Sequence, residues 1–172
     1  MSRTGRVTAG ELAPYRRNVR ILVWMQGLRM FHITVPVLAP FLLANGLPKG
    51  DIFLLEGAFA LVLMLWDAPS GYVADLWGRR RCLLAGDALQ LSAMLLFATG
   101  HEFTTFLVAE VLSAISYGLV SGSDAALLYD SLAVQGRAGE YQRLESIAIV
   151  RGRLGEGLAS IVAAALLWRS AP

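Results

Sequence analysis

Charged side chains interrupt the long apolar stretches of this 172-residue sequence, and they are the residues best placed to do chemistry. The set consists of Arg29, Glu56, Asp67, Asp87, Glu110, Asp124, Arg151, Arg153 and Glu156. An unpaired charge at the centre of a bilayer costs about 2.5–3.5 kcal/mol on insertion scales. If the stretches cross a membrane, these residues must therefore pair, lie near headgroups or line water.

Some of these residues, together with one histidine, are candidates for a polar cavity, a gate or a proton relay: Arg29, His32, Asp67, Asp124, Arg153 and Glu156. His32 and Glu156 fall near the middle of their apolar stretches, where His32 can titrate near neutral pH and Glu156 can do so if it is buried. Three acids and three arginines fall nearer the basic loops and indicate a mutually neutralising gate network: Arg29, Asp67, Asp87, Asp124, Arg151 and Arg153. The sharper alternative is that Arg29 or Asp67 contacts an anionic or cationic substrate. Alternatively, Glu156 pairs with Arg153, three residues earlier, and His32 is a packed helix residue.

The composition explains why a bilayer enters the argument. The sequence is 56% hydrophobic and 16% charged, whereas soluble domains contain roughly 45–50% apolar and about 25% charged residues. The formal net charge is +2, and the basic residues form no surface typical of nucleic-acid binding. We therefore expect a membrane protein, surrounded by the lipid bilayer, that does not bind nucleic acid.

The apolar stretches are long enough to be transmembrane helices, which need about 20 residues to cross a core of roughly 30 Å. Turn-forming residues such as Gly46, Pro48, Gly78 and Gly100 separate them. The predicted fold is an all-α membrane protein with a bundle of about five transmembrane helices. The predicted spans are 21–44, 52–74, 82–99, 105–128 and 147–168, between an N-terminal tail (1–20) and a C-terminal end (169–172).

Lysine and arginine are distributed unevenly over the connecting segments. The tail and the second and fourth loops contain Arg3, Arg6, Arg16, Arg17, Arg20, Arg79, Arg80, Arg81, Arg137 and Arg143. The first and third loops and the C-terminal end contain only Lys49 and Arg169. Because basic loops stay in the cytoplasm, the tail is predicted to be cytoplasmic in a multi-pass protein of the plasma (inner) membrane.

The second loop, Gly71–Arg81, combines residues with distinct structural uses. Gly71 has no side chain and allows another helix to approach closely. Asp75 is predicted to precede the third transmembrane helix, where its carboxylate would accept hydrogen bonds from free backbone N–H groups. Gly78 can adopt a positive φ and reverse the chain. The loop is therefore predicted to be a tight, charged turn.

Arginines follow this turn directly, and Arg79 and Arg80 can reach a carboxylate at a neighbouring helix end. Asp130, at the cytoplasmic end of the fourth span, is the expected partner. The order glycine, three residues, aspartate, two residues, glycine, arginine and a second basic residue resembles the signature loop of the major facilitator superfamily. The stretches Asp67–Gly71 and Ser121–Leu132 resemble members of that family as well.

The resemblance implies a conformational latch that holds the cytoplasmic side shut, built from Gly71, Asp75, Gly78, Arg79, Arg80 and Asp130. It implies secondary active transport of a small solute by alternating access, with H⁺ as a candidate coupling ion. Because the family fold has two halves, the sequence is expected to be its N-terminal portion, lacking the second half. Where the antiporter branch has Gly-Pro, this sequence has Gly155-Glu156, which argues against drug–proton antiport. A transport-inactive membrane scaffold or sensor is the alternative.

Enzymatic signatures are missing from the sequence. It has no phosphate-binding loop of the Gly-x-x-x-x-Gly-Lys-Ser/Thr kind, and no Ser/His/Asp, Cys/His or metal-ligand constellation. Its one cysteine, Cys82, cannot form an internal disulfide. We therefore expect a protein that is not an enzyme and that uses no cofactor or metal.

Overall fold

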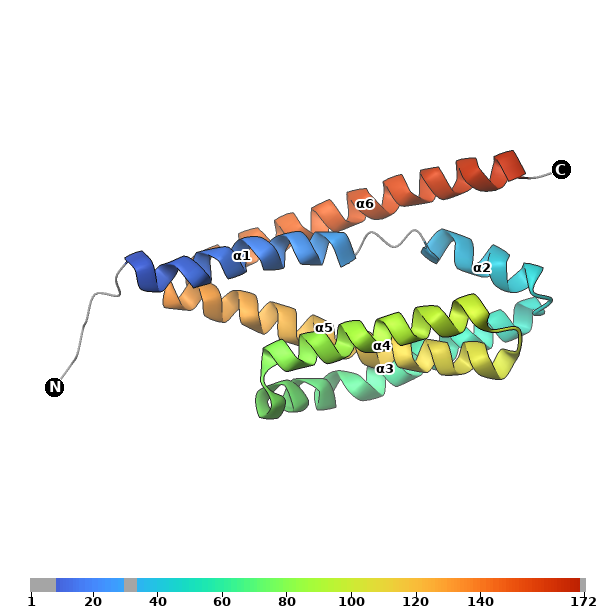
Figure 1. Ribbon diagram of the computed structural model, residues 1–172, viewed down its shortest axis with the longest axis horizontal. Helices are drawn as coiled ribbons and strands as arrows, with labels where there is room; N and C mark the ends of the chain where they lie inside the picture. Colours follow the sequence, from blue (N-terminus) through green and yellow to red (C-terminus); the bar gives the residue numbers. More distant parts are fainter. Residues whose placement is uncertain (1–8, 30–33, 171–172) are drawn as a thin grey trace. The chain divides into compact units, whose positions relative to one another are not determined.

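The computed structural model describes residues 9–29 and 34–170 (Figure 1). The elements are α1 (Ala9–Arg29), α2 (Thr34–Ala44), α3 (Lys49–Trp77), α4 (Arg79–Thr99), α5 (Phe103–Val134), the short 3-10 helix η1 (Ala138–Glu140) and α6 (Tyr141–Ser170). Within these ranges the regular structure is entirely helical. The prediction of an all-α protein is confirmed.

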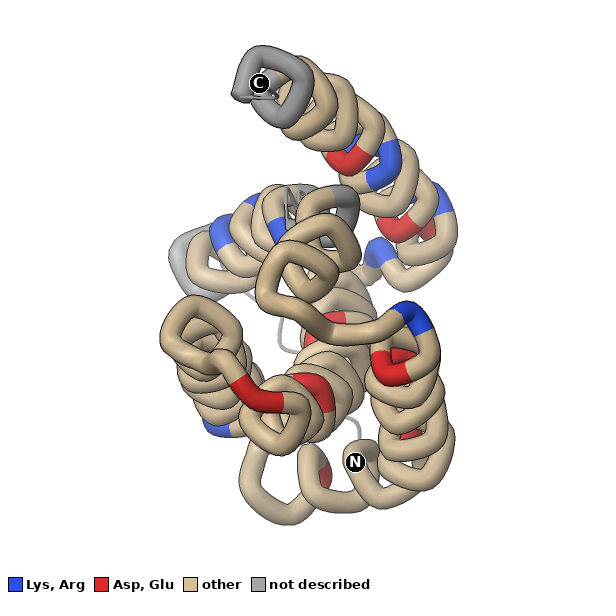
Figure 2. The backbone as a smooth tube through the Cα atoms, turned by 90° about the vertical axis from the view of Figure 1, so that its right-hand side faces the viewer, with Lys and Arg blue, Asp and Glu red and all other residues tan. Residues whose placement is uncertain are grey.

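Three of the described helices, α3, α4 and α5, are long and apolar enough to cross a membrane. They contain the predicted spans 52–74, 82–99 and 105–128. Few positions along the tube are charged, as Figure 2 shows. The chain is therefore a multi-pass membrane protein. The predicted span 147–168 lies inside α6, and the predicted span 21–44 falls on α1, α2 and residues outside the described part. The total of five transmembrane helices therefore stays a prediction.

The chain divides into two compact units. Unit 1 contains residues 1–32 and 125–162, and therefore α1, the last part of α5 and most of α6. Unit 2 contains residues 33–124 and 163–172, and therefore α2, α3, α4, the first part of α5 and the last part of α6. In unit 2, α3, α4 and the first part of α5 run alongside one another (Figure 1).

An apolar cluster closes one end of unit 2. Leu42, Leu47, Leu55 and Phe106 are its buried members. The ring of Phe106 packs edge-on against Phe41, with 6.2 Å between ring centroids, and is stacked on Phe97 at 6.1 Å. We call this the end cluster; it joins α2, α3, α4 and α5 at the end that carries the α4–α5 connection.

Small residues let α4 and α5 pack closely. A Cβ atom on Gly86 would lie 2.6 Å from Val120 Cγ2 and 3.2 Å from the backbone oxygen of Ser116. The buried Ser116 hydroxyl donates a 2.7 Å hydrogen bond to the Gly86 carbonyl. Between helices in lipid, close backbone approach and interhelical hydrogen bonds replace the hydrophobic effect as the source of association.

The outer face of α3 is apolar and uncovered. Phe53, Leu54, Leu61, Met64 and Leu65 are all exposed along it. In water such a continuous surface would favour aggregation, whereas in a bilayer it contacts lipid chains without cost. The exposure of these side chains is therefore what a membrane-spanning helix requires.

Candidate functional site

A single residue connects α3 to α4. Gly78 follows Trp77, the last residue of α3, and precedes Arg79, the first residue of α4. It has φ 85° and ψ 133°. Its N–H donates to the Ala74 carbonyl at 3.1 Å, and its carbonyl accepts from the N–H groups of Arg81 (3.0 Å) and Cys82 (3.2 Å). The predicted positive φ of Gly78 is confirmed, and the turn is tighter than the sequence indicated.

One other expectation for this turn is wrong, and a second has no support among the described residues. Asp75 lies inside the last turn of α3 and not directly before the first residue of α4. No side-chain hydrogen bond caps the start of α4. The helix continues through Asp75 because no residue between Gly71 and Trp77 forces a break before Gly78. Gly71 is exposed, and a Cβ atom there would meet no described atom within 4 Å, so the described residues show no close helix approach at Gly71.

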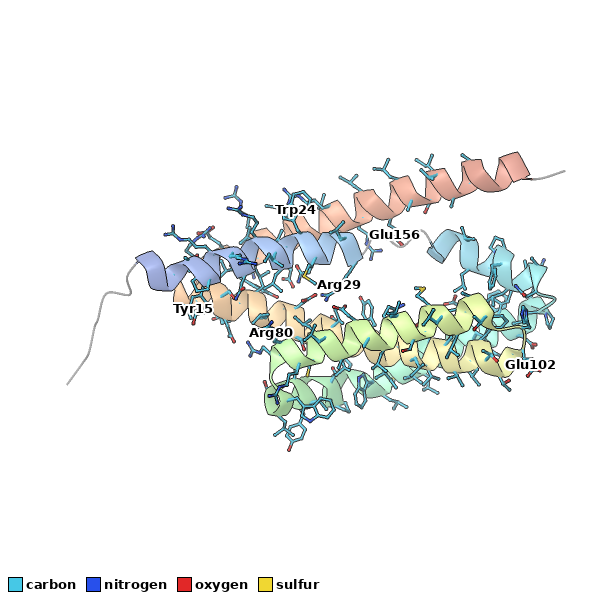
Figure 3. All side chains as sticks on the ribbon, in the orientation of Figure 1. Tyr15, Trp24, Arg29, Arg80, Glu102 and Glu156 are labelled. Atoms are coloured by element: carbon cyan, nitrogen blue, oxygen red, sulfur yellow. The ribbon has the colours of Figure 1, made fainter. Side chains whose placement is uncertain are left out.

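The basic residues of the turn open α4. Arg79 is half-buried and Arg80 is exposed. Arg80 and Glu102 lie at opposite ends of unit 2, as Figure 3 shows. Asp130 is exposed in the last part of α5 and belongs to unit 1. Its partnership with the arginines therefore stays a prediction.

The structure pairs two of the proposed cavity residues. Arg153 Nη1 lies 2.8 Å from Glu156 Oε2, on consecutive turns of α6. The side chain of Arg153 is 69% exposed and that of Glu156 is 31% exposed. This confirms the alternative in which the two residues neutralise each other. The Glu156 carboxylate therefore has a cationic partner on its own helix.

The remaining cavity candidates occupy different environments. Arg29 is half-buried at the end of α1, and Asp124 is buried in α5. Asp67 is exposed on α3, and its backbone carbonyl accepts a 2.7 Å hydrogen bond from the Ser70 hydroxyl. His32 lies outside the described residues. Their joint action as a gate network stays a prediction.

Some functional features were missed by sequence reasoning. The Arg151 guanidinium lies 5.2 Å from the centre of the Trp24 ring, a cation–π contact inside unit 1. Glu110 was singled out only as one of the charges inside the apolar stretches, yet it is one of two buried acids among the described residues, with Asp124. Its burial depends on tertiary packing, which an acid in an apolar stretch of sequence does not reveal.

The connection between α5 and α6 is held by polar and aromatic contacts. Arg137 donates two 2.7 Å hydrogen bonds to the Glu140 carboxylate, which lower the pKa of Glu140 and raise that of Arg137. The Tyr141 hydroxyl donates to Glu145 at 2.7 Å, and its ring packs edge-on against Tyr129 at 5.7 Å. Burial and this hydrogen bond raise the pKa of Tyr141 to about 12.

Comparison with known proteins gives no matching family model. The chain is 28% identical over 131 residues to quinolone resistance protein NorA of Staphylococcus aureus strains Mu50 and N315, which covers 76% of the chain and 34% of NorA. It is 32% identical over 106 residues to the uncharacterized membrane protein YJR124C of Saccharomyces cerevisiae, which covers 58% of the chain and 23% of that protein.

The chain thus spans about a third of the length of the first of these relatives. The similarity to NorA confirms the resemblance to the major facilitator superfamily that the turn motif indicated. No enzyme family is indicated.

Proposed function

Because the chain is homologous to part of a major facilitator superfamily transporter, we propose that it takes part in secondary active transport of a small solute by alternating access. The membrane is the plasma (inner) membrane, the N-terminus is cytoplasmic, and five helices of a partial superfamily fold cross the bilayer. H⁺ is the candidate coupling ion. The homology to NorA is the observation that carries the proposal.

The turn at Gly78 is the proposed latch on the cytoplasmic side. With only one residue between α3 and α4, the ends of these helices move together. Asp75 and Arg79 are therefore held at one fixed corner of unit 2, four residues apart across the turn. A rigid charged corner can lock and release a partner helix end, and Asp130 is the proposed partner.

The solute is proposed from the printed name of the relative. NorA is a quinolone resistance protein, so a quinolone is the first solute to test with this chain. The Gly155-Glu156 sequence in α6 argues against coupling drug export to proton entry through the antiporter mechanism. Solute and coupling ion should therefore be measured separately.

The latch is tested with one substitution and a matched control. We would express the chain in bacteria that lack their own quinolone exporters and measure accumulation of a fluorescent quinolone. Asp75→Asn should raise accumulation to the level of cells without the chain. Asp51→Asn makes the same change in the first turn of α3, at the opposite end of the helix, and should leave accumulation at the wild-type level.

The other outcomes separate the two functions. If Asp75→Asn and wild type accumulate the same reduced amount of quinolone, the latch role is refuted. If wild type inserts into the membrane but accumulation equals that of cells without the chain, quinolone transport is refuted. That second result favours the alternative, a transport-inactive membrane scaffold or sensor that retains the helix bundle.

A further inference from the structure

Two arginines flank one tryptophan on an exposed face of unit 1. The Arg151 guanidinium, on α6, lies 5.2 Å from the centre of the Trp24 ring, on α1. Arg20 precedes Trp24 by four residues, so these two side chains share a face of α1. All three residues are exposed, and Figure 3 labels Trp24. We call Arg20, Trp24 and Arg151 the Trp24 cluster.

The Trp24 cluster lies near the basic side of the predicted membrane region. Trp24 is three residues inside the predicted span 21–44, and Arg151 is four residues inside the predicted span 147–168. At 1.5 Å per residue, they lie about 4.5 and 6 Å along their helix axes from the span starts. The cation–π contact joins residues of matching depth. This is the level just below the inner headgroups, where tryptophan is enriched.

No described acid neutralises these two arginines. Among the residues that the structure describes, no ion pair joins Arg20 or Arg151 to a carboxylate. The acids of α6 on either side of Arg151 have other partners, since Glu145 accepts a hydrogen bond from a tyrosine and Glu156 from an arginine. An arginine inside a predicted span must then reach the headgroups or find an anion there.

Apolar side chains continue from the Trp24 cluster towards the middle of the predicted spans. Leu28 follows Trp24 by four residues on α1, and Leu154 and Leu158 follow Arg151 by three and seven residues on α6. These spacings keep them on the faces of the cluster, and all three leucines are exposed. A ligand placed here meets cations at one end and apolar side chains at the other. A lipid matches both parts, whereas a free anion uses only the first.

We propose that the Trp24 cluster binds the phosphate group of an anionic phospholipid of the inner leaflet, with phosphatidylglycerol as the type. Arg20 and Arg151 donate to the phosphate oxygens in the forked geometry that guanidinium groups allow. The Trp24 ring holds the Arg151 guanidinium in place through its cation–π contact. The acyl chains lie along the exposed leucines. A zwitterionic lipid fits less well, because it brings its own ammonium group to a site with two cations.

The site is tested by measuring lipid binding to the full chain. We would purify the chain in maltoside detergent, add phosphatidylglycerol or phosphatidylcholine with the same acyl chains, and count bound lipids by native mass spectrometry. Phosphatidylglycerol should bind more tightly. A basic residue at an anionic surface raises affinity roughly fivefold. Arg20→Gln combined with Arg151→Gln should therefore weaken phosphatidylglycerol binding by roughly 20-fold and leave phosphatidylcholine binding unchanged.

Arg137→Gln is the matched control for charge. Arg137 also belongs to unit 1 and is exposed, but it pairs with Glu140 and lies outside the predicted spans. Its substitution removes one positive charge and should leave the affinity for phosphatidylglycerol at the wild-type value. Equal weakening by Arg137→Gln and by Arg151→Gln alone would overturn the inference, since the charge of the whole unit would then account for binding.

Variants of the ring and of the guanidinium groups keep the result interpretable. Trp24→Leu should weaken phosphatidylglycerol binding because Arg151 loses its support, whereas Trp24→Phe keeps a ring and should weaken it less. If the double glutamine variant fails to fold, Arg20→Lys combined with Arg151→Lys keeps both charges without the forks and should still bind more weakly than wild type. Wild-type affinity in either folded double variant would overturn the inference.

Two further outcomes would also overturn it. The first is equal affinity of the wild-type chain for phosphatidylglycerol and phosphatidylcholine. The second is displacement of phosphatidylglycerol by inorganic phosphate, which would mean a site for free anions instead of a lipid. The inference goes beyond the proposed function, because lipid binding is measured without any solute. A chain that binds phosphatidylglycerol here and moves no quinolone would refute transport alone.

Discussion

Replacing Gly78 by alanine should destabilise the α3–α4 turn through the backbone alone. Its φ of 85° with ψ of 133° is a conformation that residues with a Cβ atom rarely adopt. Holding a non-glycine residue in such a region costs about 1–3 kcal/mol. A Cβ atom at Gly78 would meet no described atom within 4 Å, so a steric clash does not add to this cost.

Gly71→Ala is the matched control within the same motif. Gly71 is also exposed, and a Cβ atom there would also meet no described atom within 4 Å. It lies inside α3, however, where alanine is favoured over glycine by about 0.8–1 kcal/mol. The two substitutions add the same atoms to equally open positions, and their effects should differ in sign.

The single cysteine of the chain supplies the assay. Cys82 is fully buried in the first turn of α4, and its N–H donates to the Gly78 carbonyl at 3.2 Å. A membrane-permeable thiol reagent can react with it only when the turn opens, so the labelling rate reports the free energy of opening. A loss of 1–3 kcal/mol should raise that rate by roughly five- to 150-fold.

The comparison between Gly78→Ala and Gly71→Ala shows whether the positive φ of Gly78 holds the α3–α4 turn. We expect Gly78→Ala to label much faster than wild type, and Gly71→Ala to label at the wild-type rate or more slowly. Equal labelling rates for the two variants would falsify the argument that the positive φ of Gly78 holds the turn. A faster rate for Gly71→Ala would instead mean that close helix packing at Gly71 matters, as the sequence had suggested.

Two further predictions concern the helix contact and the α5–α6 connection. Gly86→Ala should lower stability by about 1–3 kcal/mol, because its Cβ atom would lie 2.6 Å from Val120 Cγ2 and 3.2 Å from the Ser116 backbone oxygen. Thermal unfolding should show this loss; a wild-type melting temperature would contradict it, and Gly57→Ala, with open space around its Cβ atom, is the control. The pKa of Tyr141 is raised from 10.0 to about 12, so its stabilising contribution should be complete below pH 10 and lost as pH rises through 12. Tyr141→Phe should remove this alkaline loss, and an unchanged pH profile of unfolding in that variant would refute the assignment.

The features that could be predicted from the sequence depend on neighbours along the chain. The spans that became α3, α4 and α5 follow from apolar length, which a bilayer selects directly. The Arg153–Glu156 pair follows from three-residue spacing on one helix. The positive φ of Gly78 follows from its place between two long helical segments. None of these needs knowledge of which helix faces which.

The features that could not be predicted depend on tertiary contacts. Gly71 and Gly86 look equivalent in the sequence, yet only Gly86 meets a neighbouring helix. The difference lies in which face of each helix turns towards its partner, and that face is set by packing. Glu110 is a similar case: it is buried in α5, whereas Glu56, also an acid in an apolar stretch, is exposed on α3. Spacing within one segment carries no information on either point.

The charges around Gly78 are placed against the preference of the helices that carry them. Asp75 lies in the last turn of α3, at the negative end of its dipole, and Arg79 and Arg80 lie in the first turn of α4, at the positive end. Each such placement costs roughly 0.3–1 kcal/mol in an exposed position. The positive-inside rule accounts for the arginines, but it gives aspartate no reason to occupy Asp75. Helix stability and the positive-inside rule together therefore leave Asp75 unexplained, whereas the latch proposed above would give its carboxylate a use.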